Sequence, residues 1–481
     1  MRKAARHITG SLLALLLGSA GCRALQEARQ AQQAVSPRAQ AEGAVCACPV
    51  FDLQQKQLPD LVAFALTNRP SMRACRLAVE DARLALKQID AAAPLVSATP
   101  WTGLSLAGSA GYSAASAHAP LRDLSWDTEG SAAGALSLDL LLYDFGRHAA
   151  QAREQSEKVV AAELALLDEG FTVFEEVTER FFTLLEKDAL FEVALTNEIE
   201  FASHLQQAKE KLAAGEGLKY DVMRATYNYT DACEKRVNAS NDVSNAGSEM
   251  LRVLGIVVSH GDRDKVVWRL RNPLREMRRA FEPTTVTAAR VFGVACTNAP
   301  RMQVKRAYLR AASAAVDAAR ADLYPELSLR ASLNWTDPLW YWSWGVEAAQ
   351  SLFSGFRKTT ALERATVALR QRDTELDVAE QDLSLEIALA VSERDNARNS
   401  FETARASVVQ ARENLDMAHE QFRVGELDTV DFNTAVNDYT TALGNRVTAF
   451  YRGQIAESKL FALAGLKPRF AMGFVYEEDI R

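Results

Sequence analysis

The side chains best suited to chemistry are scattered along this sequence. Its six histidines, at positions 7, 118, 148, 204, 260 and 419, show no metal-ligand spacing, and neither a nucleophile elbow nor a phosphate-binding loop is present. The aspartates and glutamates are spread along stretches that look like solvated helix faces. We therefore predict a protein that is not an enzyme and that uses no cofactor or metal.

Two aspartates stand out because their surroundings occur twice. Asp221 follows Gly215 by six residues and Asp431 follows Gly425 by six, so that the two pairs lie 210 positions apart. Six further identities share this offset: Ala225, Tyr229, Thr230, Ala232, Val237 and Gly255 recur as Ala435, Tyr439, Thr440, Ala442, Val447 and Gly465. These eight identities at one offset therefore predict an internal twofold repeat.

Each copy is predicted to contain the same elements in the same order: short helices, two strands, a very long helix, a glycine turn and a second long helix. The short helices are interrupted at Asn68 and Pro70 in the first copy and, 230 positions later, at Asn298 and Pro300 in the second. The predicted segments are 1–21 (signal peptide), 22–50 (tether), 51–255 (first repeat), 256–283 (linker), 284–466 (second repeat) and 467–481 (tail).

Residues 1–21 have the layout of an export signal. Basic residues open it, and the mostly apolar stretch from Ile8 to Leu17 that follows is too short to span a bilayer. Small residues then precede Cys22, an ending that resembles a bacterial lipoprotein signal. We predict lipidation of Cys22, with ordinary cleavage nearby as the alternative. Arg23 stands where an aspartate would favour the inner membrane, so we expect the outer membrane.

Charge and cysteine content limit the partners. The net charge is −7, and loss of the signal's three cations makes the mature chain more acidic still, which argues against nucleic acid. Five cysteines follow Cys22, too few and too scattered for a disulfide scaffold. Cys46 and Cys48 lie in the Ala- and Gln-rich tether, and we interpret them as incidental thiols rather than a metal site or a pair.

Four stretches alternate apolar and polar residues with period two, which indicates strands with one apolar face. They cover about residues 101–112, 126–145, 326–336 and 340–353, and six of the seven tryptophans lie in these regions. An apolar outer face, a polar inner face and aromatic residues near strand ends are typical of a transmembrane barrel. A soluble antiparallel sheet alternates in the same way and is the alternative. The charged residues on the polar face, Glu129, Asp139, Arg330 and Glu347, favour the barrel.

Four strands cannot close a barrel, and an open edge in lipid leaves backbone groups unsatisfied. The chain must therefore oligomerise. Membrane barrels begin at about 8 strands, so a dimer is the minimum and a trimer would supply about 12.

The longest helices are predicted over about residues 147–214, 218–254, 356–424 and 427–464. Residues 356–424 contain neither Gly nor Pro and can form one helix about 100 Å long. Apolar residues in it are spaced by seven in two series: Leu362, Leu369, Leu376 and Leu383, then Phe401, Val408, Leu415 and Phe422. The step of 18 between the series predicts a coiled-coil stutter. Each repeat thus forms a long antiparallel hairpin with a glycine tip.

Each long helix follows a strand through a glycine corner, at residues 143–147 and 352–357. These corners, the Asn-x-Pro helix starts and the tip pattern Val-Gly-x5-Asp followed by Ala-x3-Tyr resemble the outer-membrane efflux protein family, the TolC-like outer membrane factors, over about residues 50–466. The resemblance implies a mainly α protein: a homotrimer whose 12-stranded barrel crosses the outer membrane and continues as a periplasmic barrel of helical hairpins. It also implies an exit duct served by a periplasmic adaptor and an inner-membrane pump.

The resemblance implies a gate at the hairpin tips, with acidic residues around the narrowest point and polar links between neighbouring hairpins. Asp221 and Asp431 match the family's tip aspartates, although an aspartate also stabilises the first turn of a helix by about 0.3 to 1 kcal/mol. Phe422 and Leu427 replace the tyrosine and arginine of some members, and Arg423 and Asp428 could supply links instead. A periplasmic coiled-coil adaptor or envelope scaffold without a pore is the alternative function, and the cargo is left open.

The substitution Asp431→Ala tests this gate. If Asp431 lies at the constriction, its removal is expected to raise the conductance of the channel in lipid bilayers. An unchanged conductance would count against that position.

Overall fold

The computed structural model describes residues 58–91, 104–114, 128–215, 217–256, 287–336, 339–424, 426–466, 470–471 and 474–475. The predicted signal peptide, Cys22, the tether, nearly all of the linker and Gly425 lie outside these residues. The described part is mainly helical, and none of its helices combines the length and the hydropathy needed to cross a membrane.

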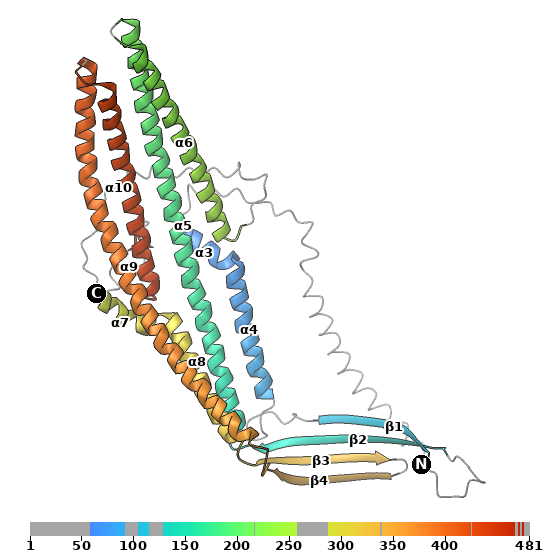
Figure 1. Ribbon diagram of the computed structural model, residues 1–481. Coiled ribbons are helices and arrows are strands. Elements are labelled where there is room, and N and C mark those ends of the chain that lie inside the picture. Colours follow the sequence, from blue (N-terminus) through green and yellow to red (C-terminus); the bar gives the residue numbers. More distant parts are fainter. Residues whose placement is uncertain are drawn as a thin grey trace. The chain divides into compact units, whose positions relative to one another are not determined.

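The same order of elements occurs twice (Figure 1). The first set is α3 (Leu58–Asn68), α4 (Pro70–Ala91), β1 (Leu104–Ala114), β2 (Thr128–Tyr143), α5 (Arg147–Ala213) and α6 (Lys219–Val253). The second is α7 (Ala288–Asn298), α8 (Pro300–Ala321), β3 (Glu326–Thr336), β4 (Leu339–Ala349), α9 (Arg357–Val424) and α10 (Thr429–Leu463). Corresponding helices contain 11 and 11, 22 and 22, 67 and 68, and 35 and 35 residues.

Element bounds differ from the sequence expectations by up to four residues, most at the end of β4, which stops at Ala349. A short strand pair, β5 (Phe470–Ala471) and β6 (Phe474–Val475), lies in the predicted tail and was not anticipated. Two-residue strands carry too little alternation to be recognised from sequence.

The four longer strands form one antiparallel sheet in the order β1-β2-β3-β4 (Figure 1). Its register aligns Leu136, Leu333 and Trp342 in one row, and the side chains of these three residues are exposed. Alternate rows are polar. Arg330 donates to Asp139 at 2.6 Å and pairs with Glu347 at 2.8 Å, which ties β2, β3 and β4 together. The sheet therefore has one exposed apolar face and one polar face.

Each strand-to-helix corner uses two successive residues in the left-handed region. Phe145 (φ 54°) and Gly146 (φ 88°) form the first, and Gly355 (φ 62°) and Phe356 (φ 61°) the second. At the first corner the buried Asp144 carboxylate accepts from the backbone N–H of His148 at 2.6 Å. This bond satisfies one of the orphan donors at the start of α5.

The helices follow the same lateral order as the strands that they adjoin. α5 packs against α4 and α6 on one side and against α8 and α10 on the other, and α9 packs against α8 and α10. The sequence of neighbours is therefore α4/α6, α5, α8/α10, α9. The matching strand order is β1, β2, β3, β4.

Buried residues on α9 confirm the second of the two predicted heptad series. Phe401, Val408, Leu415 and Phe422 are all buried, and buried positions step alternately by three and four from Ile387 onward. Two successive steps of four, from Ala379 to Leu383 to Ile387, break this alternation. The break places the stutter at the start of the interval in which the sequence predicted it.

The repeated glycines Gly255 and Gly465 pack against the repeated Asn-x-Pro junctions. Both are left-handed, with φ of 79° and 66°. A Cβ on Gly465 would lie 2.8 Å from the Ala299 Cα and 2.8 Å from the Asn298 carbonyl oxygen. The end of α10 thus approaches the backbone between α7 and α8 too closely for any side chain. The corresponding approach in the first half is less tight, since a Cβ on Gly255 would lie 3.3 Å from the Arg69 Cα.

The substitution Gly465→Ala is expected to destabilise the protein by about 1 to 3 kcal/mol or more. It places an alanine in the left-handed region, which strains the backbone, and its Cβ would clash with the backbone at Ala299. The matched control is Gly293→Ala, since Gly293 lies exposed inside α7 with open space around its Cα. That change should be neutral or stabilising by roughly 0.5 to 1 kcal/mol. Thermal unfolding followed by circular dichroism compares them, and equal melting temperatures would refute the expectation.

Candidate functional site at the hairpin tips

The first tip reverses the chain between α5 and α6 through two glycines. Gly215 is left-handed (φ 79°), and its N–H donates to the Leu212 carbonyl at 3.1 Å. A Cβ on Gly217 would lie 2.9 Å from the Leu212 backbone nitrogen. The turn is therefore built for glycine at both positions.

The two predicted tip aspartates differ in their contacts. Asp221 stands in the first turn of α6, where its carboxylate accepts from the Leu218 N–H at 3.3 Å and its own N–H donates to the Leu218 carbonyl at 3.1 Å. It thus stabilises the helix start, as one of the two sequence interpretations expected. Asp431, in the first turn of α10, is exposed. Asp428, the residue that caps α10, is also exposed, and its side chain makes no capping bond.

Behind the tips, four rings join the two hairpins. We call His204, His419, Phe422 and Phe432 the tip cluster. The Phe432 ring stacks on His204 with centroids 4.8 Å apart, and it lies 4.9 Å from His419 and 5.0 Å from Phe422. His204 and Phe432 are each 1% exposed. Rings from α5, α9 and α10 therefore form one packed contact.

Two polar contacts flank the tip cluster. Lys211 of α5 donates to the Phe422 carbonyl at 2.6 Å, and its ammonium lies 4.0 Å from the centroid of the Phe422 ring. His419 Nε2 of α9 lies 3.2 Å from the Glu200 carboxylate of α5. Both contacts link the first hairpin to the second.

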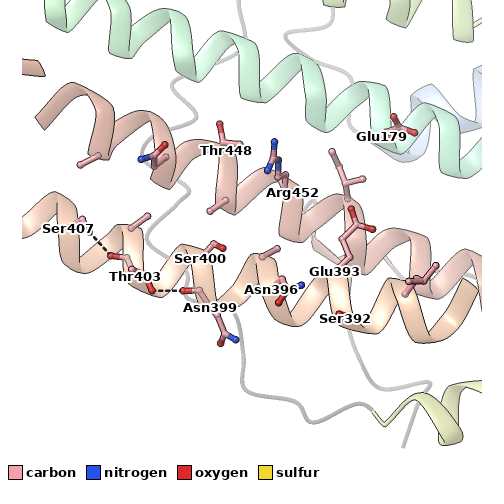
Figure 2. Close-up of a pocket in the computed structure, with 17 residues that line it drawn as sticks. Glu179, Ser392, Glu393, Asn396, Asn399, Ser400, Thr403, Ser407, Thr448 and Arg452 are labelled. Atoms are coloured by element: carbon pink, nitrogen blue, oxygen red, sulfur yellow. Dashed lines mark hydrogen bonds between the residues drawn. The ribbon is translucent and has the colours of Figure 1, made fainter. Parts of the chain in front are cut away.

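A large polar groove runs along α9 and α10 farther from the tips (Figure 2). Its volume is about 1150 Å³, and Glu179 of α5 lies at its border. Small polar residues dominate its wall: Ser392, Asn396, Asn399, Ser400, Thr403 and Ser407 from α9, and Asn445 and Thr448 from α10. Thr403 and Ser407 each donate to the carbonyl four residues earlier in α9. Glu393 of α9 and Arg452 of α10 also line it, so the groove offers both hydrogen-bonding and charged groups.

Acidic residues also lie half-buried on α5, and burial is the main cause of their altered protonation. Burial and the neighbouring Glu192 raise the pKa of Asp188 to about 6. Among the described residues, no group of three or more His, Cys, Asp or Glu side chains is arranged to hold a metal ion.

The sequence profile of the family described as outer membrane efflux protein matches residues 61–255 and 292–466. The chain belongs to this family. Efflux proteins transport substrates, so membership confirms that the chain is not an enzyme, and it indicates an outer-membrane location.

Individual relatives are distant in sequence but close in fold. The outer membrane efflux protein BepC of Brucella suis biovar 1 (strain 1330) is 24% identical over 282 residues, covering 56% of this chain and 58% of BepC. The structure of CusC has a TM-score of 0.74 at 17% identity and covers 85% of this chain and 92% of its own. The Campylobacter jejuni CmeC outer membrane channel has a TM-score of 0.71 at 16% identity, covering 88% and 87%.

Phe422 stands where some family members have a gate tyrosine, and its ring is buried in the tip cluster. Arg423, which we expect could serve as a substitute link, is exposed and pairs with Glu420 on its own helix at 2.8 Å. The contacts that do cross between hairpins, from Lys211, His204 and His419, were missed. Only the heptad position of Phe422 could have pointed to them.

Removal of the central ring should loosen the tips. Phe432→Ala is expected to cost about 3 to 5 kcal/mol, because it leaves a cavity beside three other rings. The amides of α5 and α10 around the tip cluster should then exchange with solvent at least about a hundredfold faster. Val430→Ala, an exposed change in the same helical turn, is the control and should alter exchange little. Equal exchange in both variants would contradict a supporting role for the tip cluster.

Proposed function

We propose that this protein is the outer-membrane channel of a tripartite efflux or type I secretion system. It is a passive exit duct that an adaptor and a pump open at its periplasmic tips. The strands and the helices follow the same lateral order, and both layers end in an open edge on each side. This arrangement is the main support for the proposal. Family membership and the folds of CusC and CmeC support it.

The open edges call for further copies of the chain. β1 pairs only with β2 and β4 only with β3 within the described sheet, so each has an unpaired side. Joining β4 of one copy to β1 of the next, and α9 to the α4/α6 side, continues both layers at once. We propose a homotrimer in which three sheets form a 12-stranded barrel above a tunnel of helices. The polar groove along α9 and α10 would then receive α6 of the neighbouring copy, whose exposed side is also rich in Asn and Ser.

The barrel would place the apolar face of the sheet in lipid and the polar face in the lumen. Trp340, Trp342 and Trp344 are all well exposed on β4. Exposure of these rings to water is unfavourable, and contact with lipid would remove that cost. Tyr143, Phe145 and Tyr324 gather at the first corner, with Phe145 stacked on Tyr324 at 5.5 Å. Aromatic rings of this kind belong at the boundary between lipid and water.

We place the gate at the glycine tips, around Gly215 and Gly425. The exposed carboxylates of Asp428 and Asp431 are available to line the constriction, whereas Asp221 is engaged in its helix start. Lys211 and the His419–Glu200 pair hold the two hairpins of one chain together behind the tips.

We further propose that the two halves are an internal repeat and that Cys22 carries a lipid anchor in the outer membrane. The matched helix lengths and the two separate matches to the family profile support the repeat. The small residues before Cys22 support the anchor. Mass spectrometry of the mature N-terminus tests it, and an unmodified residue after cleavage at another site would reject it.

One experiment separates the channel from the alternative, a periplasmic coiled-coil scaffold. Outer-membrane fractions should yield heat-resistant trimers that conduct ions in planar bilayers. A soluble monomer or dimer without pore activity would rule the channel out and favour the scaffold.

The substitution Trp342→Lys tests the membrane-facing side of the sheet. A lysine on a lipid-facing strand position costs roughly 2 to 4 kcal/mol at mid-membrane, so the yield of assembled trimer should fall sharply. Tyr341→Lys is the matched control, because Tyr341 is the adjacent residue on the opposite face and is also exposed (58% against 72% for Trp342). Equal losses in the two variants would argue against the assigned faces.

A further inference from the structure

His204 is buried between the two hairpins without a polar partner. It lies on α5 and is 1% exposed, with the rings of Phe422 and Phe432 each 4.8 Å from its own. Neither ring nitrogen has a hydrogen-bond partner within the described part of the protein. The neutral imidazole already leaves both ring nitrogens unpaired, and the charged form would in addition lose its hydration without a hydrogen-bonded carboxylate among the described residues.

The charged groups around His204 do not favour its protonation. Lys211 approaches from its own helix, Asp221 from α6, and His419 from α9 with its partner Glu200. α10 contributes the Phe432 ring, while its first-turn carboxylate, Asp431, is exposed. Burial is the largest cause that lowers the pKa of His204, to about 4, and Lys211 and His419 add to it. Asp221 opposes them.

Two further buried amides lie on α5 and α10. The Asn197 Oδ1 atom on α5 and both side-chain polar atoms of Asn433 on α10 lack partners among the described residues. Unpaired polar atoms reduce the net stability of the packed form, and water would satisfy them if the helices moved apart. The contact is therefore poised to separate once a charge is added.

We propose that His204 is a proton switch for the hairpin tips: the neutral imidazole allows α5 to pack on α9 and α10, and its protonation separates them. The inference rests on the proposed channel function only for its consequence, which is easier opening of the tips on acidification. The separation itself is a property of one chain.

The packed and the separated tips bind a proton on His204 at different pH, and this difference sets how the stability of the packed form changes with pH. In the packed form His204 binds a proton only near pH 4, whereas a hydrated imidazole binds one near its ordinary pKa of 6.5. The packed form therefore loses stability as the pH falls below about 6.5. The ratio of separated to packed tips should rise roughly 30-fold between pH 7.5 and pH 5.

Distance measurements on the purified full-length protein test the switch. Spin labels at Lys209 and Gln421, exposed positions on α5 and α9, are introduced in a variant whose cysteines are replaced by serine. A second, longer distance is expected to gain population at pH 5. His204→Phe keeps a ring in the tip cluster but cannot titrate, and it should abolish the change. His419→Gln removes the other imidazole of the tip cluster, and this variant should still show the pH-dependent change in distance.

Single-channel recordings give the functional readout. The open probability of the wild-type channel should rise as the pH on the tip side falls from 7.5 to 5, and that of His204→Phe should not. A wild-type distance distribution that does not change with pH, or an equal change in His204→Phe, would overturn the switch. Absence of any conductance, with the pH-dependent distance intact, would instead overturn the channel function and leave the switch standing.

Discussion

The constraint on which the rest of this structure depends is the hydrogen bonding of backbone at the edges of a small sheet. A strand edge in water can be solvated, but an edge in lipid cannot, and four strands always leave two edges. The chain presents its unpaired strands at the two ends of the same lateral order that its helices follow. In the proposed assembly, a ring of identical copies would pair the strand edges and complete the helical layer at the same time.

Packing within the chain is uneven along its length, and this unevenness matters for function. At the Asn-x-Pro junctions, glycine allows backbone to meet backbone, as at Gly465 and Ala299, and such contacts tolerate no displacement. At the tips, by contrast, the contact between hairpins contains a buried imidazole and amides without partners. The junctions lie partway along the long helices, where Ala299 packs with Leu383 and Ile387 of α9, and they hold these helices in position. The tip contact is the one that we propose separates.

Much of the fold follows from periodicity that the sequence displays directly. The period-two alternation around Arg330 and Trp342 predicted the strands, and the seven-residue spacing from Phe401 to Phe422 predicted which face of α9 is buried. These signals are strong because burial on one side imposes them over many residues. The contacts at the tips left no such signal. Lys211 and Phe422 meet across 211 positions, and a single lysine near a glycine turn resembles any solvated residue. The partners of Phe422 left no signal for the same reason, since they come from two other helices, α5 and α10.

The matched lengths of corresponding helices make the two hairpins nearly interchangeable as building blocks, yet their sequences are not. In a closed ring of three copies, six hairpins would alternate, and contacts inside a chain would alternate with contacts between chains. Counting 210 positions from His204 leads to Asn414, and counting back from His419 leads to Lys209. The proton-sensitive contact would therefore occur only between the two hairpins of one chain, and not between hairpins of neighbouring chains. Acid would divide such a ring into three stable pairs rather than loosen it evenly, so that its aperture would widen with threefold and not sixfold symmetry.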